Sequence, residues 1–266
     1  MNNEQPPADQ QPSGQWFWSI IFGLGEALRF LTIIPLPGLP PMNERSMVRA
    51  IPWFPTAGLL IGAILVGLGA AAGMFWGDLV RAVLLVVVWG VITGGLHLDG
   101  LSDTFDAVMS WRPRERKLEI MKDSRIGAMG ALALIAVLLL KVALLTEAGA
   151  YWWQAILLAP ILGRWADLYG IYWFPAAAEG GLGRTFHDQV QRRDFWLATL
   201  GTLAVALIVA GIPGLLAWLS VGLGAYLLAW WWTRDLGGLT GDTYGALCEI
   251  GEVLALASLI AALAMR

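Results

Sequence analysis

The chain has 266 residues, of which 58% are hydrophobic and 14% are charged, and its formal net charge is −3. Soluble domains carry about 25% charged residues, so this composition is typical of a membrane protein. The acidic balance argues against a nucleic-acid partner, because no basic face is available to neutralise phosphates. The single cysteine, Cys248, excludes an internal disulfide framework and a cysteine-rich metal site. Its apolar surroundings predict a packed, unreactive thiol.

The first segment, residues 1–15, is polar, contains prolines and lacks Lys and Arg. It has no positively charged region of the kind that begins a signal peptide, so none is expected to be cleaved here. This composition predicts a disordered tail. Residues 16–266 are expected to form one transmembrane domain that carries the chemistry.

Long apolar segments follow the tail. A helix needs about 20 largely apolar residues to cross a hydrocarbon core of roughly 30 Å. Seven segments meet this need and predict an all-α, polytopic membrane bundle: 54–76, 81–98, 126–146, 153–174, 195–211, 214–232 and 245–265. Residues 16–34 contain Glu26 and Arg29, so they predict either an eighth span or a helix lying in the membrane interface.

The loops between these segments differ in positive charge. One alternating set contains nearly all the Lys and Arg residues: 35–53, 99–125, 175–194 and 233–244. The other set has Arg81 at a span edge and the terminal Arg266. The positive-inside rule predicts that the first set lies in the cytoplasm. We therefore expect a multi-pass protein of the inner cell membrane whose active site faces the cytoplasm.

The densest polar motif is Gly-Gly-Leu-His-Leu-Asp-Gly-Leu-Ser-Asp-Thr-Phe-Asp at 94–106. On a helix, Asp99, Asp103 and Asp106 share one face, because they are spaced i, i+4 and i+7. Carboxylates so close repel one another unless a cation lies between them, and Mg²⁺ binds carboxylates together with substrate phosphates. A solvated acidic face is the alternative. His97 is open to three roles: a ligand, an orienting residue or an interfacial histidine.

A second motif, Lys-Asp-Ser-Arg-Ile-Gly at 122–127, precedes the next span. Lys122 and Arg125 are candidates to hold phosphate oxygens, with Ser124 between them, since a guanidinium can grip an oxyanion in two places. The alternative is charge that only sets topology. That alternative is stronger for the cluster Arg112, Arg114, Arg116 and Lys117.

A third motif, Gly-Gly-Leu-Thr-Gly-Asp-Thr at 237–243, lies between two spans. Glycines allow the backbone to approach a ligand closely, and free N–H groups before a helix attract anions. Asp242 fits a metal ligand or a general base. It also fits the N-cap of the last helix, and the two roles are compatible.

Charges within the spans are costly, at roughly 2.5–3.5 kcal/mol each on insertion scales. Glu26 with Arg29 and Arg164 with Asp167 are spaced i, i+3. A structural ion pair explains each pair almost as well as a role in the site. Lys141 is expected to pair internally or to extend toward the interface, outside the site.

Taken together, these motifs resemble the cobalamin synthase family, the adenosylcobinamide-GDP ribazoletransferases. The matching stretches are 94–104, 119–127 and 237–243, with Arg-Phe-Leu-Thr at 29–32 and Gly-Arg at 163–164. The resemblance covers nearly the whole chain after residue 16. It implies a reaction that joins adenosylcobinamide-GDP to α-ribazole or its 5′-phosphate, releases GMP and uses Mg²⁺.

The reaction that the resemblance implies gives an expected role to each candidate residue. Asp99 and Asp103 would hold Mg²⁺, with Asp106 as a third ligand or a catalytic partner to ion-bound water. Asp242 would be a metal ligand or the base toward the attacking hydroxyl, a role for which His187 is a weaker candidate. Substrate phosphates would be held by residues that include a catalytic arginine: Arg125, Lys122, Ser124, Arg184, Arg29, Thr240 and His97. A homo-oligomer is left open.

Two other functions remain to be weighed. A CDP-alcohol phosphotransferase also uses Mg²⁺ and an aspartate-rich helix, but its Asp-Gly-x-x-Ala-Arg pattern is missing after Asp99-Gly100. An ion-coupled transporter could use Glu26, Arg164, Asp167 and Glu249, yet transporter sites lie near the bilayer midplane. The aspartates here gather toward one face, and no internal repeat is evident.

Overall fold

The computed structural model describes residues 14–41, 43–177 and 182–264, which form helices and no β-strand apart from one isolated bridge, Ala176 to Leu239. The elements are α1 (Gly14–Leu31), α2 (Glu44–Ala50), η1 (Ile51–Trp53), α3 (Phe54–Ala72), α4 (Asp78–Ile92), α5 (Leu96–Val108), α6 (Arg114–Ile120), α7 (Ala128–Glu147), η2 (Gly149–Tyr151), α8 (Trp152–Trp173), α9 (Leu182–Gln189), α10 (Arg192–Ala210), α11 (Ile212–Leu236) and α12 (Gly241–Ala264). The predicted all-α class is confirmed.

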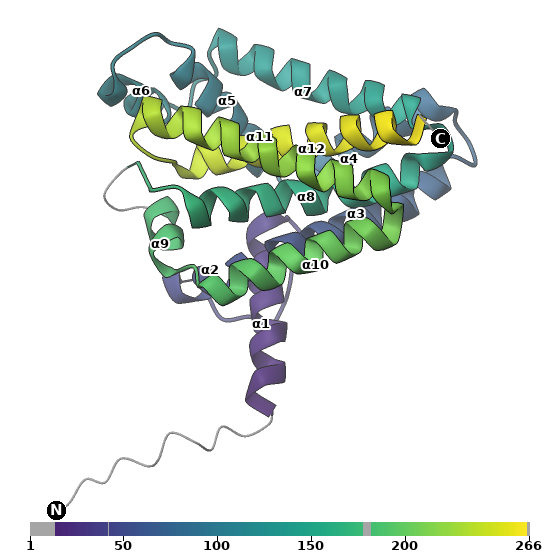
Figure 1. Ribbon diagram of the computed structural model, residues 1–266, viewed down its shortest axis with the longest axis horizontal. Helices are drawn as coiled ribbons and strands as arrows, with labels where there is room; N and C mark the ends of the chain where they lie inside the picture. The colour runs from purple at the N-terminus through teal and green to yellow at the C-terminus, as the bar shows by residue number, and fades with distance from the viewer. Residues whose placement is uncertain (1–13, 42, 178–181, 265–266) are drawn as a thin grey trace, which may run out of the picture.

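Within the described chain, five helical segments are long and apolar enough to cross a membrane: Ser46–Ala72, Ala128–Glu147, Arg192–Ala210, Ile212–Leu236 and Gly241–Ala264. The bent pair α4 and α5 raises the number to six. This is fewer than the seven or eight predicted, because α4 is short and α8 carries Arg164 and Asp167. Helix α8 is nevertheless central: it packs against α3 and α12, and most of its residues are buried (Figure 1).

The expected span 81–98 is broken. Helix α4 ends at Ile92, and α5 begins at Leu96 after a turn of 89°. Gly94 and Gly95 both have positive φ, at 60° and 69°, a conformation that glycine adopts without steric cost. The paired glycines thus turn the chain by about a right angle, and the aspartate motif lies on a helix of its own.

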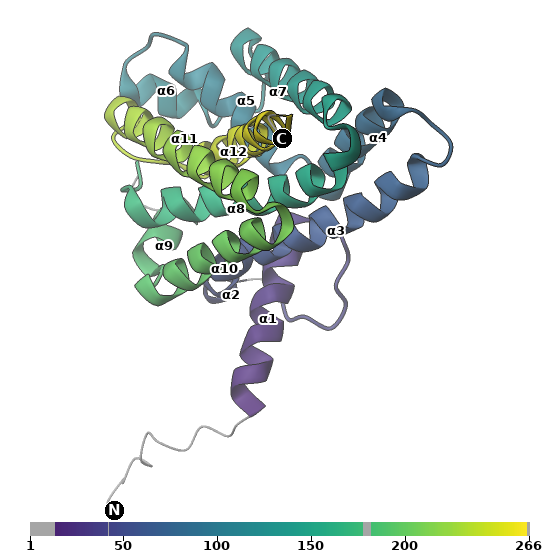
Figure 2. The same cartoon turned by 45° about the vertical axis from the view of Figure 1, so that its right-hand side comes forward.

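Helix α1 runs across the direction of the bundle helices and projects from their side (Figures 1 and 2). It is not among the candidate spans in the described residues. Its Gly23 lies against Trp53, where a Cβ would come 2.4 Å from the indole nitrogen. This arrangement favours the interfacial helix over the eighth span. Residues 1–13 of the expected tail lie outside the described residues, and residues 14 and 15 begin α1.

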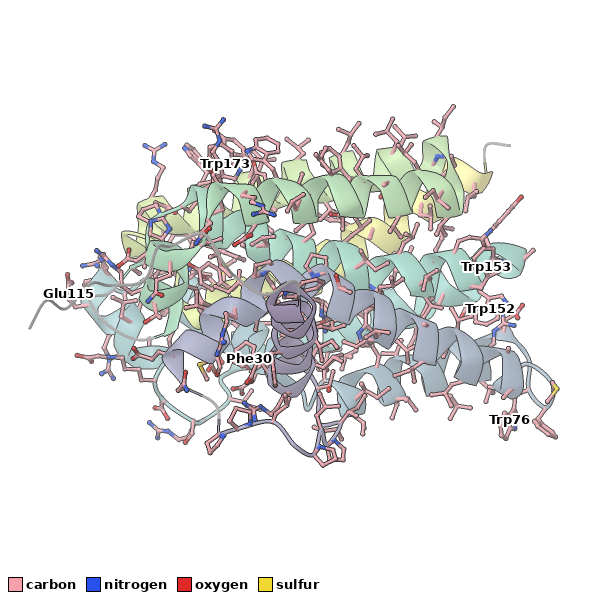
Figure 3. All side chains as sticks on the ribbon, turned by 90° about the horizontal axis from the view of Figure 1, so that it is seen from below. Phe30, Trp76, Glu115, Trp152, Trp153 and Trp173 are labelled. Carbon is pink, nitrogen blue, oxygen red and sulfur yellow. The ribbon has the colours of Figure 1, made fainter. Side chains whose placement is uncertain are left out.

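The two ends of the bundle differ in character. Helices α2, α6 and α9 lie at one end, and the end of α12 lies at the other (Figure 1). Seen from below, Glu115 marks the first end, and the tryptophans Trp76, Trp152 and Trp153 gather at the second (Figure 3). The loops that the sequence grouped by positive charge therefore share one end.

Candidate active site

The site is built on a close crossing of α5 and α12. A Cβ on Gly100 would lie 2.7 Å from the carbonyl oxygen of Asp242, and one on Gly245 would lie 3.2 Å from the Cα of His97. Only glycine permits backbones to approach so closely. Gly100 and Gly245 therefore bring the start of α12 against the first turns of α5.

This crossing gathers the carboxylates. Asp99 is exposed at the end of the bundle, while Asp103 and Asp242 are partly buried. The charges of Asp99, Asp242 and Asp106 all act on Asp103, and that of Asp99 acts on Asp242. Among the described residues, no lysine or arginine forms an ion pair with Asp99, Asp103 or Asp242. The result is a set of oxygen ligands whose mutual repulsion a divalent cation would relieve.

Asp106 has a different environment. Its two carboxylate oxygens accept hydrogen bonds from the backbone N–H groups of Gly127 (2.7 Å) and Gly130 (2.9 Å). These groups belong to the first turn of α7, which has no capping side chain of its own. Asp106 thus caps α7 from another helix. This contact supports a structural role and leaves its expected roles as metal ligand and catalytic residue without support from geometry.

The N-cap of α12 is Thr240. The Thr243 N–H donates to the Thr240 hydroxyl oxygen at 3.2 Å, and the Thr240 N–H donates to the Thr243 hydroxyl oxygen at 2.7 Å. This reciprocal pair satisfies the helix start. The capping interpretation of Asp242 is therefore wrong, and its carboxylate is available for chemistry. Thr240 was expected to bind substrate, but its hydroxyl is already engaged in the cap.

The second motif lies beside this cluster. Asp123 accepts two hydrogen bonds from the guanidinium of Arg125, at 2.9 Å from Nε and 2.5 Å from Nη2. These bonds lower the pKa of Asp123 to about 2. Lys122, Ser124 and Arg125 are exposed, and the charge of Asp123 acts on Asp103. The motif therefore forms an accessible rim with the cations that a phosphate needs.

The basic cluster of α6 does more than set topology. Arg114 donates from Nε to the carbonyl oxygen of Leu236 (2.6 Å) and from Nη2 to that of Ala177 (2.7 Å). Lys117 forms an ion pair with Asp235 at 2.6 Å. These contacts attach α6 to the end of α11. The purely topological interpretation of these two residues is wrong.

Arg184 and Arg29 lie on other elements. Arg184 pairs with Asp188 at 2.8 Å on α9. On the same helix, a Cβ on Gly183 would lie 3.4 Å from the Gly241 nitrogen. Arg184 therefore directly follows a residue that lies near the start of α12 in space. Arg29 pairs with Glu26 at 2.5 Å, as the structural alternative predicts, and donates to the carbonyl oxygen of Pro40. His187 is turned toward α8, with its Nδ1 2.8 Å from the carbonyl oxygen of Ile171, which does not favour its role as a base.

A buried charged network lies under the crossing. Lys141 pairs with Glu249 at 2.6 Å and with Glu252, and Arg164 pairs with Glu252. All four side chains are buried, and Lys141 also lies over the ring of Trp89. The expected internal pairing of Lys141 is confirmed. The Arg164–Asp167 ion pair that the spacing allows is not formed, because the guanidinium turns to Glu252 on α12.

His97 connects this network to the site. Its Nδ1 lies 3.2 Å from Arg164 Nη2, and its Nε2 lies 3.5 Å from Asp167 Oδ2. The ring is only 5% exposed. Of the roles left open for His97, this placement favours orientation of α5, since both ring nitrogens face the interior. Direct contact with substrate has no support from this position.

Sequence reasoning did not find this network. Glu249 and Glu252 are acidic residues in an apolar span, and their partners come from α7 and α8, more than 80 residues away along the chain. The available signal was the cost of each buried charge, which predicts that such residues pair with one another. Cys248 is buried beside Glu252, consistent with a packed thiol.

Comparison with known proteins identifies the family to which the chain belongs. The family model described as cobalamin-5-phosphate synthase matches residues 23–260. The chain belongs to this family. Relatives named adenosylcobinamide-GDP ribazoletransferase include those of Roseiflexus sp. (60% identical, 100% of this chain and 98% of the relative), Herpetosiphon aurantiacus (53%, 88% and 94%) and Clostridium acetobutylicum (36%, 90% and 96%). No solved structure matches the chain. The cobalamin-5-phosphate synthase match spans all three motifs and every element from α2 to α11.

Proposed function

We propose that this chain joins adenosylcobinamide-GDP to α-ribazole, or to its 5′-phosphate, and releases GMP. The product is adenosylcobalamin or its 5′-phosphate. The family match and the names of the relatives support this late step of cobalamin assembly. The structural observation that carries the proposal is the meeting of Asp99 and Asp103 on α5 with Asp242 on α12, with no ion-pair partner among the described residues.

Asp99, Asp103 and Asp242 are our candidates to hold Mg²⁺. The donor set fits this ion, because Mg²⁺ prefers oxygen ligands and combines protein carboxylates with substrate phosphates. When bound, the ion would neutralise the diphosphate and the charge that develops on the departing GMP. Asp106 is left out of this set, because its oxygens cap α7.

The protein's own groups position the reactants. An α-ribazole hydroxyl attacks the phosphorus on the cobinamide side, a new P–O bond forms, and the bond to GMP breaks. We assign the hydroxyl proton to Asp242, which lies in the partly buried crossing. Lys122 and Arg125 hold phosphate oxygens at the exposed rim, and Arg184 contributes from α9. Such catalysis consists mainly of positioning and charge neutralisation.

The direct test incubates purified protein with adenosylcobinamide-GDP, α-ribazole and Mg²⁺ and follows GMP and cobamide by chromatography. Formation of GMP and cobamide in equal amounts supports the proposal. Replacement of Mg²⁺ by EDTA should abolish the formation of both. GMP release without a cobamide product would indicate hydrolysis and contradict the transfer. Uptake of a corrinoid into liposomes without GMP release would instead support a transporter. The internal ion pairs of Arg164 with Glu252 and of Glu249 with Lys141 disfavour that function.

We also propose that the polar end of the bundle faces the cytoplasm, on the positive-inside rule. Single cysteines at the exposed positions Arg112 and Lys122, in a Cys248→Ala background, test this orientation. A membrane-impermeant thiol reagent should label them only in inverted vesicles. Labelling in intact cells would reverse the orientation.

A further inference from the structure

The buried charged network under the α5–α12 crossing contains more acids than bases. Among the described residues, it consists of two cations and three acids: Lys141, Arg164, Asp167, Glu249 and Glu252. Each of these residues is at most 4% exposed. With all three acids ionised, the network would carry one net negative charge. An uncompensated charge in a protein interior is costly, and an ionisable group in that position usually becomes neutral instead.

The ion pairs show which acid carries the excess charge. Glu249 accepts a hydrogen bond from Lys141 at 2.6 Å, and Glu252 accepts from both Lys141 and Arg164. Asp167 forms no ion pair with a lysine or arginine of the described chain. Its Oδ1 atom is buried and has no hydrogen-bond partner in the same part of the chain. The excess negative charge therefore falls on Asp167.

His97 does not compensate this charge. Its Nδ1 lies 3.2 Å from Arg164 Nη2, and a guanidinium has hydrogens to donate but no lone pair to offer. Nδ1 must therefore be the acceptor, which places the ring hydrogen of a neutral histidine on Nε2. That nitrogen faces Asp167 Oδ2 at 3.5 Å. A second ring hydrogen would point at the guanidinium, so the imidazole stays neutral.

The same hydrogen bond argues against a metal ion beside Asp167. His97, Asp167 and Cys248 each offer one ligand atom, and these atoms lie within 4.8 Å of one another. A metal would need the lone pair of His97 Nε2, but that nitrogen carries the ring hydrogen. The Arg164 guanidinium, which contacts the same ring, would also repel a metal cation. A proton is the cation that fits this position.

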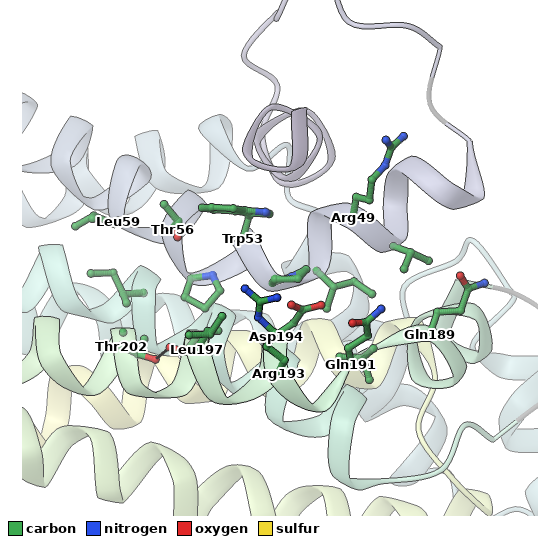
Figure 4. Close-up of a pocket in the computed structure, with 18 of the residues that line it drawn as sticks. Arg49, Trp53, Thr56, Leu59, Gln189, Gln191, Arg193, Asp194, Leu197 and Thr202 are labelled. Carbon is green, nitrogen blue, oxygen red and sulfur yellow. Dashed lines mark hydrogen bonds between the residues drawn. The ribbon is translucent and has the colours of Figure 1, made fainter. Parts of the chain in front are cut away.

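Packing keeps solvent away from Asp167. A cavity of about 590 Å³ lies between α3 and α10, but the only residue that α8 contributes to its lining is Ile161 (Figure 4). Ionisable groups from four helices surround the contact between His97 and Asp167: Lys141 on α7, Arg164 on α8, and Tyr244, Cys248, Glu249 and Glu252 on α12, with His97 itself on α5. Both cations of this set are already paired with glutamates.

We propose that Asp167 binds one proton and is a neutral carboxyl group in the folded protein. The proton brings the network to neutrality, with two cations and two carboxylates. Oδ1 is the atom available for the proton, because it has no partner as an ionised oxygen. Oδ2 continues to face the Nε2–H of His97, so the contact between α8 and the first turn of α5 is kept. The site requires no substrate, so it stands or fails independently of the proposed transfer.

Infrared spectroscopy of the purified protein in detergent tests for this proton. At about pH 8, ordinary carboxyl groups are ionised, whereas a protonated carboxyl group gives a separate C=O band that shifts in D2O. The parent should show such a band, and labelling of its aspartate side chains with ¹³C should shift it. Asp167→Asn should lose the band. Asp188→Asn is the matched control, because Asp188 is an exposed carboxylate paired with Arg184, and it should keep the band.

The pH dependence of unfolding provides a second measurement. An unfolded aspartate is ionised above about pH 6, so folding of the parent takes up one proton at Asp167. The equilibrium constant for unfolding should therefore rise with pH more steeply in the parent than in Asp167→Asn, by about tenfold per pH unit. Asp188→Asn should follow the parent. Asp167→Asn should fold, because an amide preserves the shape and the neutrality of a protonated carboxyl group.

Four results would overturn the proposal. The first is the absence of a protonated carboxyl band in the parent. The second is a band that ¹³C-aspartate leaves in place, which would assign the proton to a glutamate. The third is the same pH dependence of unfolding in the parent and in Asp167→Asn. The fourth is zinc that copurifies with the parent and is lost in Asp167→Asn. Failure of Asp167→Asn to fold would also contradict a neutral Asp167, and the labelling experiment on the parent decides the matter without any variant.

Discussion

Gly100 and Asp242 lie in backbone contact: a Cβ on Gly100 would be 3.0 Å from the Asp242 Cα and 2.7 Å from its carbonyl oxygen. This contact fixes how far the carboxylates of α5 lie from that of α12. Gly100→Ala should therefore separate the two helices and lower turnover by roughly 100-fold, the effect of a misplacement of about 1 Å.

Gly90→Ala is the control for this substitution. Its Cβ would meet Leu98 at 3.6 Å, an ordinary contact. Both variants should remain folded in thermal melts, while GMP release should fall only in Gly100→Ala. Normal release in Gly100→Ala would mean that the crossing does not set the site's geometry.

Variants at Asp242 and Thr240 should distinguish the proposed catalytic role of Asp242 from the helix-capping role of Thr240. Thr240→Val removes the N-cap hydroxyl and should destabilise the protein by about 0.5–2 kcal/mol. Asp242→Asn leaves that cap intact, so stability should hold while turnover collapses. The free energy of unfolding in mixed detergent micelles and the rate of GMP release, measured for both variants, check these two expectations. A stable and active Asp242→Asn would remove this residue from the proposed mechanism.

Asp106 should behave as a helix cap. Asp106→Ala removes the acceptor of two backbone N–H groups and should destabilise the protein by about 1–3 kcal/mol. The Mg²⁺-dependent gain in melting temperature, measured with substrate present, should survive in this variant. Asp123→Asn, whose contacts are with exposed Arg125, is the control and should melt normally. Loss of the Mg²⁺ effect without loss of stability would restore Asp106 as a ligand.

The buried network should be essential for folding. Glu252→Gln removes the ion-pair partner of Arg164 and one partner of Lys141, and breaking such a buried pair costs about 3–5 kcal/mol. Glu119→Gln removes an exposed pair with Arg116 and should cost less than about 1 kcal/mol. Equal stability of the two variants would show that the network contributes little.

The sequence predicted the local features well and the distant contacts poorly. The i, i+4, i+7 spacing of the aspartates placed them on one helix face, and α5 is that helix. Apolar length predicted most spans within a few residues. It did not predict the break at Gly94-Gly95, because an apolar run shows no change of direction. The roles of Asp106 and Thr240 depend on which N–H groups lie opposite them, and hydropathy carries no such information.

The pairing of charges shows the same limit. Spacing along one helix suggested an Arg164–Asp167 pair, but packing of α8 on α12 offers Glu252 to the guanidinium instead. Conversely, Glu26 and Arg29 lie on a helix at the side of the bundle, and there the local pair forms. Local spacing decides pairing only where no other helix brings a competing partner.

The central claim is that Asp99, Asp103 and Asp242 form one Mg²⁺ site, and Asp99→Asn and Asp103→Asn test it most directly. Each variant removes one ligand charge and relieves repulsion, so each should melt at least as high as the parent without metal. Turnover should fall by about 100- to 1,000-fold, and the rise in melting temperature with Mg²⁺ and adenosylcobinamide-GDP should shrink. Unchanged turnover, or activity lost only together with folding, would contradict the site.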